Sequence, residues 1–178
     1  MPHDDDDLRR AIAEPVHLEP YDPGWPAAFE GERWRLLADF GGDLTAVEHI
    51  GSTAVPGLEA KPVVDLLAAV ASMPAADALL PALCAAGWHT SAAYNATLGG
   101  RRWLMRQSAG HRTHHLHLVV AGTPEWADPV RFRDRLRADP ALAAAYAALK
   151  RSSVAAHAAD RDAYTRSKGA FVAAALAG

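Results

Sequence analysis

The residues with the clearest chemical potential are a glycine-serine pair and a solitary aspartate. Gly51 and Ser52 come directly after Ile50 in the stretch VEHIGST, and Asp65 lies inside the apolar stretch AKPVVDLL. A carboxylate taken out of water is costly unless it is paired, hydrogen-bonded or bound to a cation. Because the neighbours of Asp65 predict a buried strand, we expect this carboxylate to have a partner.

The Gly51-Ser52 pair has the composition of a phosphate-binding turn. Gly51 has no side chain to keep a phosphate away from the backbone N–H groups, Ser52 adds a hydroxyl donor, and Thr53 can add another. Twelve residues separate Ser52 from Asp65, so a returning strand would place the carboxylate beside the turn. A carboxylate next to a bound phosphate suggests Mg²⁺, which prefers carboxylates together with phosphate oxygens.

Two histidines offer further metal ligands. His115 and His117 lie two residues apart in THHLHLVV, so their side chains share one face of a strand. If that strand lies beside the one with Asp65, a His-His-Asp cluster results, and its imidazoles suit Mn²⁺, Fe²⁺ or Zn²⁺ better than Mg²⁺. The alternative is that both histidines are hydrogen-bonded polar residues on a half-exposed face. For the whole site we expect a divalent ion, Mg²⁺ or Mn²⁺, with Zn²⁺ less favoured.

Basic residues near these stretches could hold an anionic substrate. Lys61 opens the second apolar stretch, where its ammonium group could meet a phosphate or simply be solvated. Tyr164 and Lys168 lie four residues apart and could close a pocket or pack the last helix on the sheet.

An arginine-rich stretch, VRFRDRLRAD, holds two pairs with helical spacing, Arg131 with Arg135 and Arg133 with Arg137. A guanidinium group can donate two hydrogen bonds to one phosphate at once. The alternative is a solvated helix face with ion pairs to neighbouring aspartates.

The spacing of apolar residues, with Gly and Pro as breaks, predicts the elements that position these residues. Helices are expected over 26–40, 74–87, 124–138, 139–158 and 160–177, and strands over 44–50, 60–70 and 113–120, with a hairpin formed by 88–94 and 101–107. Since strands fill the middle and helices both ends, the order indicates an α/β or α+β domain whose mixed sheet is flanked by helices.

Length and composition bound the organisation. The 178 residues suffice for one domain, expected over 15–178 after an acidic, flexible tail over 1–14. A net charge of −3 argues against nucleic-acid and membrane-surface binding. The single cysteine, Cys84, the lack of an apolar run of about 20 residues, and an N-terminus without an apolar signal core predict a cytoplasmic protein. Composition does not indicate the oligomeric state.

The run EHIGSTAVPGLEAKPVVDLL resembles the signature of the GrpB family, a group of small bacterial proteins with the nucleotidyltransferase fold of the DNA polymerase beta superfamily. The similarity extends over most of the chain, through YDPGW, HHLHLVV, FRDRLRADPALAAAYAALK and YTRSKGAF. It implies a nucleotidyltransferase-like fold with C-terminal helices. Within the arginine-rich stretch, it selects Arg133 and Arg137 as the pair that would grip an anion.

The resemblance also implies an activity, with one departure. In the superfamily, the turn is followed by two carboxylates one residue apart and a third from a later strand, which hold two metal ions. Gly51, Ser52 and Asp65 match this pattern, but Leu67 stands where the second carboxylate would be. A nucleotidyltransferase-type enzyme that acts on a nucleotide or phosphorylated small molecule is one expectation. The alternative is a non-catalytic module that binds a nucleotide or a coenzyme A-type ligand.

Overall fold

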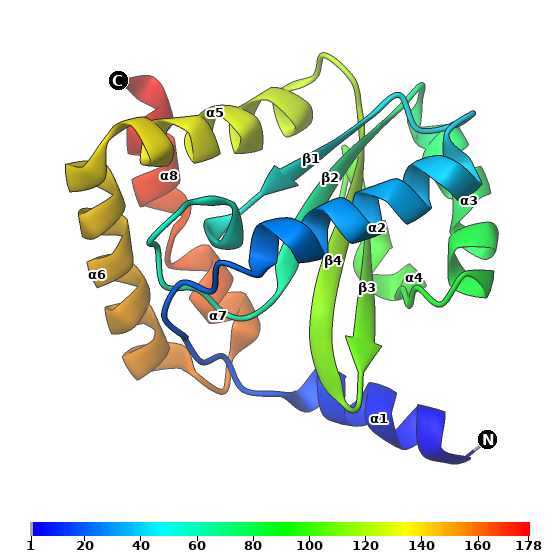
Figure 1. The fold of residues 1–178 in the computed structure, drawn as a ribbon, viewed down its shortest axis with the longest axis horizontal. Coiled ribbons are helices and arrows are strands. Elements are labelled where there is room, and N and C mark those ends of the chain that lie inside the picture. The colour runs from blue at the N-terminus through cyan, green and yellow to red at the C-terminus, as the bar shows by residue number, and fades with distance from the viewer. Residues whose placement is uncertain (1) are drawn as a thin grey trace.

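The computed structural model describes residues 2–178 and is built around one four-stranded mixed sheet (Figure 1). Its strands are β1 (Ala46–Ile50), β2 (Val64–Val70), β3 (Arg101–Ser108) and β4 (His111–Val120), in the order β1-β2-β4-β3. The central strands β2 and β4 are parallel, and β1 and β3 pair antiparallel with them on the two outer sides. The predicted mixed sheet flanked by helices is therefore confirmed.

One face of the sheet carries the main core. Helices α2 (Trp25–Phe40) and α3 (Met73–Ala85) pack on it. Alternate residues of β2 point to this face because side chains of a strand alternate between its two faces. The core includes Phe29, Leu36, Leu66, Ala68, Val70, Leu79, Leu83, Leu104, Leu116 and Leu118. The alternating residues of β2 between these, among them Asp65 and Leu67, therefore point to the other face of the sheet.

The C-terminal helices lie beside that other face. They are α5 (Pro124–Ala138), α6 (Pro140–His157), α7 (Arg161–Arg166) and α8 (Gly169–Ala177), which Figure 1 shows in yellow to red at one side of the sheet. Helix α6 begins as expected, because the Asp139 carboxylate accepts hydrogen bonds from the N–H groups of Ala141 and Leu142. A short 3-10 turn, η1 (Ser52–Ala54), follows β1.

The predicted hairpin of 88–94 with 101–107 is wrong. Ser91 caps a short helix, α4 (Ala92–Ala96), and only a single bridge joins His89 to Met105. Strand β3 instead forms its hairpin with β4, because Ala109 and Gly110 both have positive φ, 52° and 82°, as a tight two-residue turn requires.

The segment expected to be a flexible acidic tail contains a helix. Residues Pro2–Ala13 form α1, whose Ala11 is buried, and Arg112 donates hydrogen bonds to the carbonyls of Ala11 and Ile12 at 2.8 and 3.2 Å. Leu8, Ala11 and Ile12 have helical spacing, so the segment has an apolar stripe despite its acidic start. The domain boundary at residue 15 stays a prediction. Within residues 2–178, no helix has the length and apolar character that a membrane span needs.

Candidate functional site

The turn after β1 brings the backbone against Asp65. Ile50 pairs with Asp65 across β1 and β2, and Gly51 follows with φ of 73° and ψ of −171°. A Cβ atom on Gly51 would lie 2.5 Å from Asp65 Oδ2, so only glycine permits this approach of the carboxylate. The sequence-based expectation that Asp65 lies beside the Gly51-Ser52 turn agrees with this geometry.

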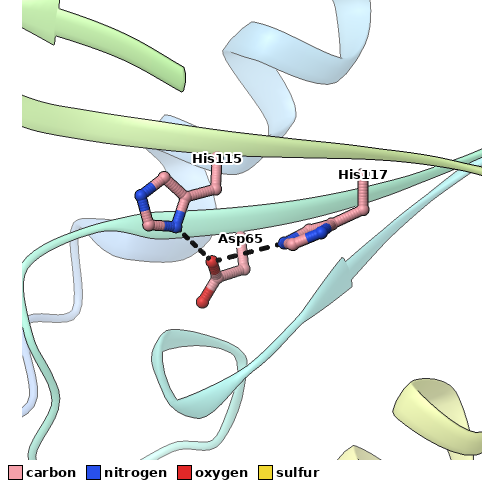
Figure 2. Close-up of side chains that lie close together, drawn as sticks. All are labelled: Asp65, His115 and His117. Carbon is pink, nitrogen blue, oxygen red and sulfur yellow. Dashed lines mark hydrogen bonds and ion pairs between the residues drawn. The ribbon is translucent and has the colours of Figure 1, made fainter. Parts of the chain in front are cut away.

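Asp65, His115 and His117 form a cluster on one face of the central strands (Figure 2). The parallel register pairs Asp65 with His115 and Leu67 with His117, so the strand pairing that such a cluster requires is present. Asp65 Oδ1 lies 3.0 Å from His115 Nδ1 and 3.9 Å from His117 Nε2. One ligand atom from each residue lies within 4.8 Å of the others.

Electrostatics favour the charge states that bind a metal. Burial opposes the ionisation of Asp65, but its contacts with His115 and His117 and the charge of Lys61 hold the pKa of Asp65 well below its usual range. Burial and the Lys61 charge lower the pKa of His115 to about 3. At neutral pH the site therefore holds a carboxylate and a neutral imidazole, the forms that coordinate metals. Two imidazoles and one carboxylate fit a single Mn²⁺, Fe²⁺ or Zn²⁺ ion.

A cavity of about 580 Å³ opens beside this cluster. Gly51, Ser52, Lys61 and Lys168 line it together with the His-His-Asp cluster, and we call this group of residues its polar end. The lining also includes the aromatic and apolar side chains of Leu8, Ile12, Tyr94, Trp103 and Met105. A volume of this size accommodates a small organic ligand, with the polar end suited to an anionic group.

The two lysines give the polar end its positive charge. Burial lowers the pKa of Lys168 to about 8, and the charge of Lys61 contributes to this lowering. The ammonium group of Lys168 lies 4.0 Å from the centre of the Tyr164 ring. Since about 8 is still above neutral pH, Lys168 remains largely cationic there, and both predicted lysines line the cavity.

Two residues that line the cavity, Tyr146 and Trp103, were not selected from the sequence, whereas Tyr164 was expected there as a residue that could close a pocket. Tyr146 and Tyr164 are buried, burial raises the pKa of both hydroxyls, and Tyr146 is hydrogen-bonded to Ser52. Trp103 pairs with His117 across β3 and β4 and packs 5.3 Å from the His115 ring. Strand parity could have placed Trp103 here once β3 was known to pair with β4, but nothing in the local sequence indicated Tyr146.

The structure does not bring Arg133 and Arg137 into the cavity. Arg133 donates to Glu48 Oε2 at 2.6 Å, to the His49 carbonyl at 2.9 Å and to Asp134 at 2.8 Å. Arg137 donates to the Ala54 carbonyl at 2.9 Å. The two guanidinium groups therefore bind to β1 and to the turn that follows it, and neither lines the cavity.

Thr53 lines the cavity, but its hydroxyl group has a structural partner. Its hydroxyl lies 3.0 Å from His49 Nε2, and the His49 ring stacks on Phe29 with 4.7 Å between the ring centres. Burial lowers the pKa of His49 to about 4, so this imidazole is neutral at neutral pH. Thr53 thus helps to anchor the turn on the core side of the sheet.

We expect Arg133→Ala to destabilise the protein by about 2 kcal/mol, because it leaves the buried His49 carbonyl without its donor and Glu48 without its partner. The Arg133 side chain is only 9% exposed, whereas the Arg137 side chain is 42% exposed. Arg137→Ala should therefore cost less than about 1 kcal/mol. Urea unfolding measures both values. Unchanged stability in Arg133→Ala, together with a tenfold loss of pyrophosphate affinity, would instead assign Arg133 to anion binding.

Comparison with known proteins gives matches over nearly the whole described domain. Residues 15–177 match the family described as "GrpB protein". The crystal structure of conserved protein GrpB from Enterococcus faecalis superimposes with a TM-score of 0.78 at 34% identity, covering 89% of this chain and 94% of that one.

Curated relatives are similar to this chain at comparable levels. A UPF0157 protein of Deinococcus radiodurans is 39% identical over 93% of this chain and 83% of its own length. The UPF0157 protein YqkA of Bacillus subtilis is 37% identical over 80% of this chain, and a dephospho-CoA kinase of Mycolicibacterium paratuberculosis is 35% identical over 90% of it. The matched regions span only 40% and 45% of these two longer relatives.

Proposed function

The chain belongs to the GrpB family, and from this premise we propose that it is a metal-dependent transferase of the nucleotidyltransferase type, acting on a nucleotide or another phosphorylated small molecule. One observation carries the proposal. Asp65, His115 and His117 converge at the polar end of the cavity, beside the Gly51-Ser52 turn and two lysines. This combination of donors offers a cation site and an anion site within one space.

Each group of residues has a distinct role in this proposal. A divalent ion held by Asp65, His115 and His117 would polarise a phosphoryl oxygen as a Lewis acid. Gly51 and Ser52 line the cavity, and their backbone N–H groups would donate to phosphate oxygens.

The lysines would stabilise the negative charge of the phosphates. Lys61 and Lys168 both line the polar end of the cavity, where their ammonium groups can meet phosphate oxygens. In the transfer, an acceptor oxygen bonds to phosphorus while the bond to the leaving phosphate breaks. The leaving group takes the bonding electrons, and the proton of the acceptor passes to water.

The ligand set supports one metal ion, not two. The superfamily position for a second carboxylate is occupied here by Leu67, which has an apolar side chain and pairs with His117 in the register. With two imidazoles in the cluster, Mn²⁺ is the ion we propose over Mg²⁺, which prefers an all-oxygen environment.

Leu67 also favours a second candidate function, a non-catalytic module that binds a nucleotide or coenzyme A-type ligand. Two matched relatives are named dephospho-CoA kinase, and the matched region is 45% of the length of the Mycolicibacterium paratuberculosis protein. A chain that shares one region with such proteins could bind the same class of ligand without carrying out a transfer.

Thermal unfolding with a panel of nucleotides and coenzyme A precursors separates the two candidates, because a ligand that prefers the native state raises the melting temperature. Each compound is tested alone and with Mg²⁺, Mn²⁺ or Zn²⁺, and hits are followed by phosphorus NMR for product. The transferase predicts a metal-dependent shift with product formed. A shift that needs no metal, with no product after prolonged incubation, would favour the binding module and count against the transferase.

A further inference from the structure

Four side chains of the cavity lining, which we call the apolar wall, take no part in the proposed binding of metal and phosphate. Leu8 and Ile12 come from α1, Tyr94 from α4 and Trp103 from β3. Among the described residues three large hydrophobic side chains are exposed, and two of them, Ile12 at 54% and Tyr94 at 39%, belong to this wall. Leu8 and Trp103 are half-buried, so all four retain apolar surface that a ligand can cover.

The aromatic members of the apolar wall are in contact with each other. The rings of Tyr94 and Trp103 meet edge to face, with 5.4 Å between their centres. Trp103 also packs against His115, so it connects the metal cluster to the apolar wall. Aromatic side chains bind the rings of ligands by stacking, and this stacking tolerates any nucleobase. The wall therefore has the chemistry that recognises an aromatic ring.

The lining as a whole is cationic. Its described residues include one carboxylate, that of Asp65, and four basic side chains: Lys61, Arg101, Arg112 and Lys168. An excess of positive charge within one cavity attracts an anion. A ligand complementary to the whole lining is consequently an anion that carries an aromatic ring.

Helix α1 lies outside the region that matches the family, which begins at residue 15. It packs against β3 and β4 (Figure 1), and Arg112 of β4 holds its end by donating to the carbonyls of Ala11 and Ile12. Ala11 is buried, whereas Leu8 and Ile12 line the cavity. This chain thus adds Leu8 and Ile12 to the residues that its family domain supplies.

We propose that the cavity selects a nucleotide, with its base on the apolar wall and its phosphate at the polar end. Leu8 and Ile12 are then specificity-determining residues, because they cover apolar ring surface that sugar and phosphate do not offer. The cavity volume of about 580 Å³ is within the range of small-molecule sites. The placement of the phosphate rests on the proposed function, whereas binding of the base by the wall does not.

Adenosine 5′-monophosphate, ribose 5-phosphate and adenosine form a matched set of probes, because the second lacks only the base and the third lacks only the phosphate. Calorimetric titration in the presence of Mn²⁺ measures the three affinities. Adenosine 5′-monophosphate should bind at least about tenfold more tightly than ribose 5-phosphate. The double variant Leu8→Ser, Ile12→Ser should lose at least about fivefold in affinity for adenosine 5′-monophosphate and keep its affinity for ribose 5-phosphate.

Two further variants make this result specific. Tyr94→Ala tests the wall from α4, so its effect does not depend on how α1 packs, and it should weaken adenosine 5′-monophosphate by a similar factor. Trp34→Ser is the matched control, because it removes a 72% exposed hydrophobic side chain from α2 that does not line the cavity. It should bind all three probes as the wild type does. Circular dichroism establishes that each variant is folded before its affinity is measured.

Two outcomes would overturn the proposal: equal affinities for adenosine 5′-monophosphate and ribose 5-phosphate, or undiminished affinity for adenosine 5′-monophosphate in either wall variant. The proposed function fails in a different way. If adenosine binds as tightly as adenosine 5′-monophosphate, and the wall variants weaken both, the phosphate site is excluded while the base site stands.

Discussion

Replacing Asp65 with alanine is expected to abolish metal binding, with Mn²⁺ affinity falling by more than about 100-fold. Mutation of a group that only orients a ligand already costs about 10- to 100-fold, and Asp65 is the only anionic donor of the cluster. After its removal two neutral imidazoles remain beside Lys61 and Lys168, whose positive charges repel a cation. Transfer activity, if it uses the ion, should disappear with it.

Calorimetric titration of Mn²⁺ measures the effect on Asp65→Ala. Asp77→Ala is the matched control, because it also removes one aspartate, but Asp77 pairs with Arg102, and neither residue lines the cavity. Its affinity should equal that of the wild type. Mn²⁺ binding by Asp65→Ala within about threefold of the wild-type value would exclude this cluster as the metal site.

Gly51→Ala is expected to damage both stability and metal binding. The backbone conformation at Gly51 is one that L-residues rarely adopt, which costs about 1–3 kcal/mol. The new Cβ would in addition lie 2.5 Å from Asp65 Oδ2, so the carboxylate must move away from the imidazoles. We expect a loss of stability in that range by urea unfolding and a fall of at least about tenfold in Mn²⁺ affinity.

Gly57→Ala separates the two contributions. Gly57 also has a positive φ, 77°, but a Cβ there would meet no atom within 4 Å. The variant should therefore lose stability through backbone strain while its Mn²⁺ affinity stays unchanged. Wild-type Mn²⁺ affinity in Gly51→Ala would show that the approach of Asp65 to the turn is unimportant for the metal.

Local pattern was sufficient to predict the residues of the cluster. The apolar neighbours of Asp65 predicted a strand, and the spacing of His115 and His117 predicted that their side chains share one face. The parallel register of β2 and β4 brings these three residues together. The end of the helix predicted over 26–40 and the start of the helix predicted at 139 were equally local features, and the structure has both.

Features that depend on packing between distant segments could not be predicted in the same way. The family resemblance selected Arg133 from a basic stretch as an anion ligand, but whether its guanidinium group meets a substrate or Glu48 is decided by how α5 packs on β1. The hairpin prediction was wrong because 88–94 and the β4 segment competed for β3, and a local pattern does not rank them. The helix at Pro2–Ala13 likewise depends on contacts with Arg112, about 100 residues away.

The parallel pairing of β2 with β4 has a consequence for the order of folding. Asp65 and His115 are 50 residues apart in the chain, and parallel neighbours need a long crossover, so their pairing closes a large loop at a high entropic cost. The β3-β4 hairpin is local, so we expect it to form before its non-local docking on β2. A metal ion that needs all three ligands would therefore bind only after the centre of the sheet has closed, and would selectively stabilise the finished fold over its precursors.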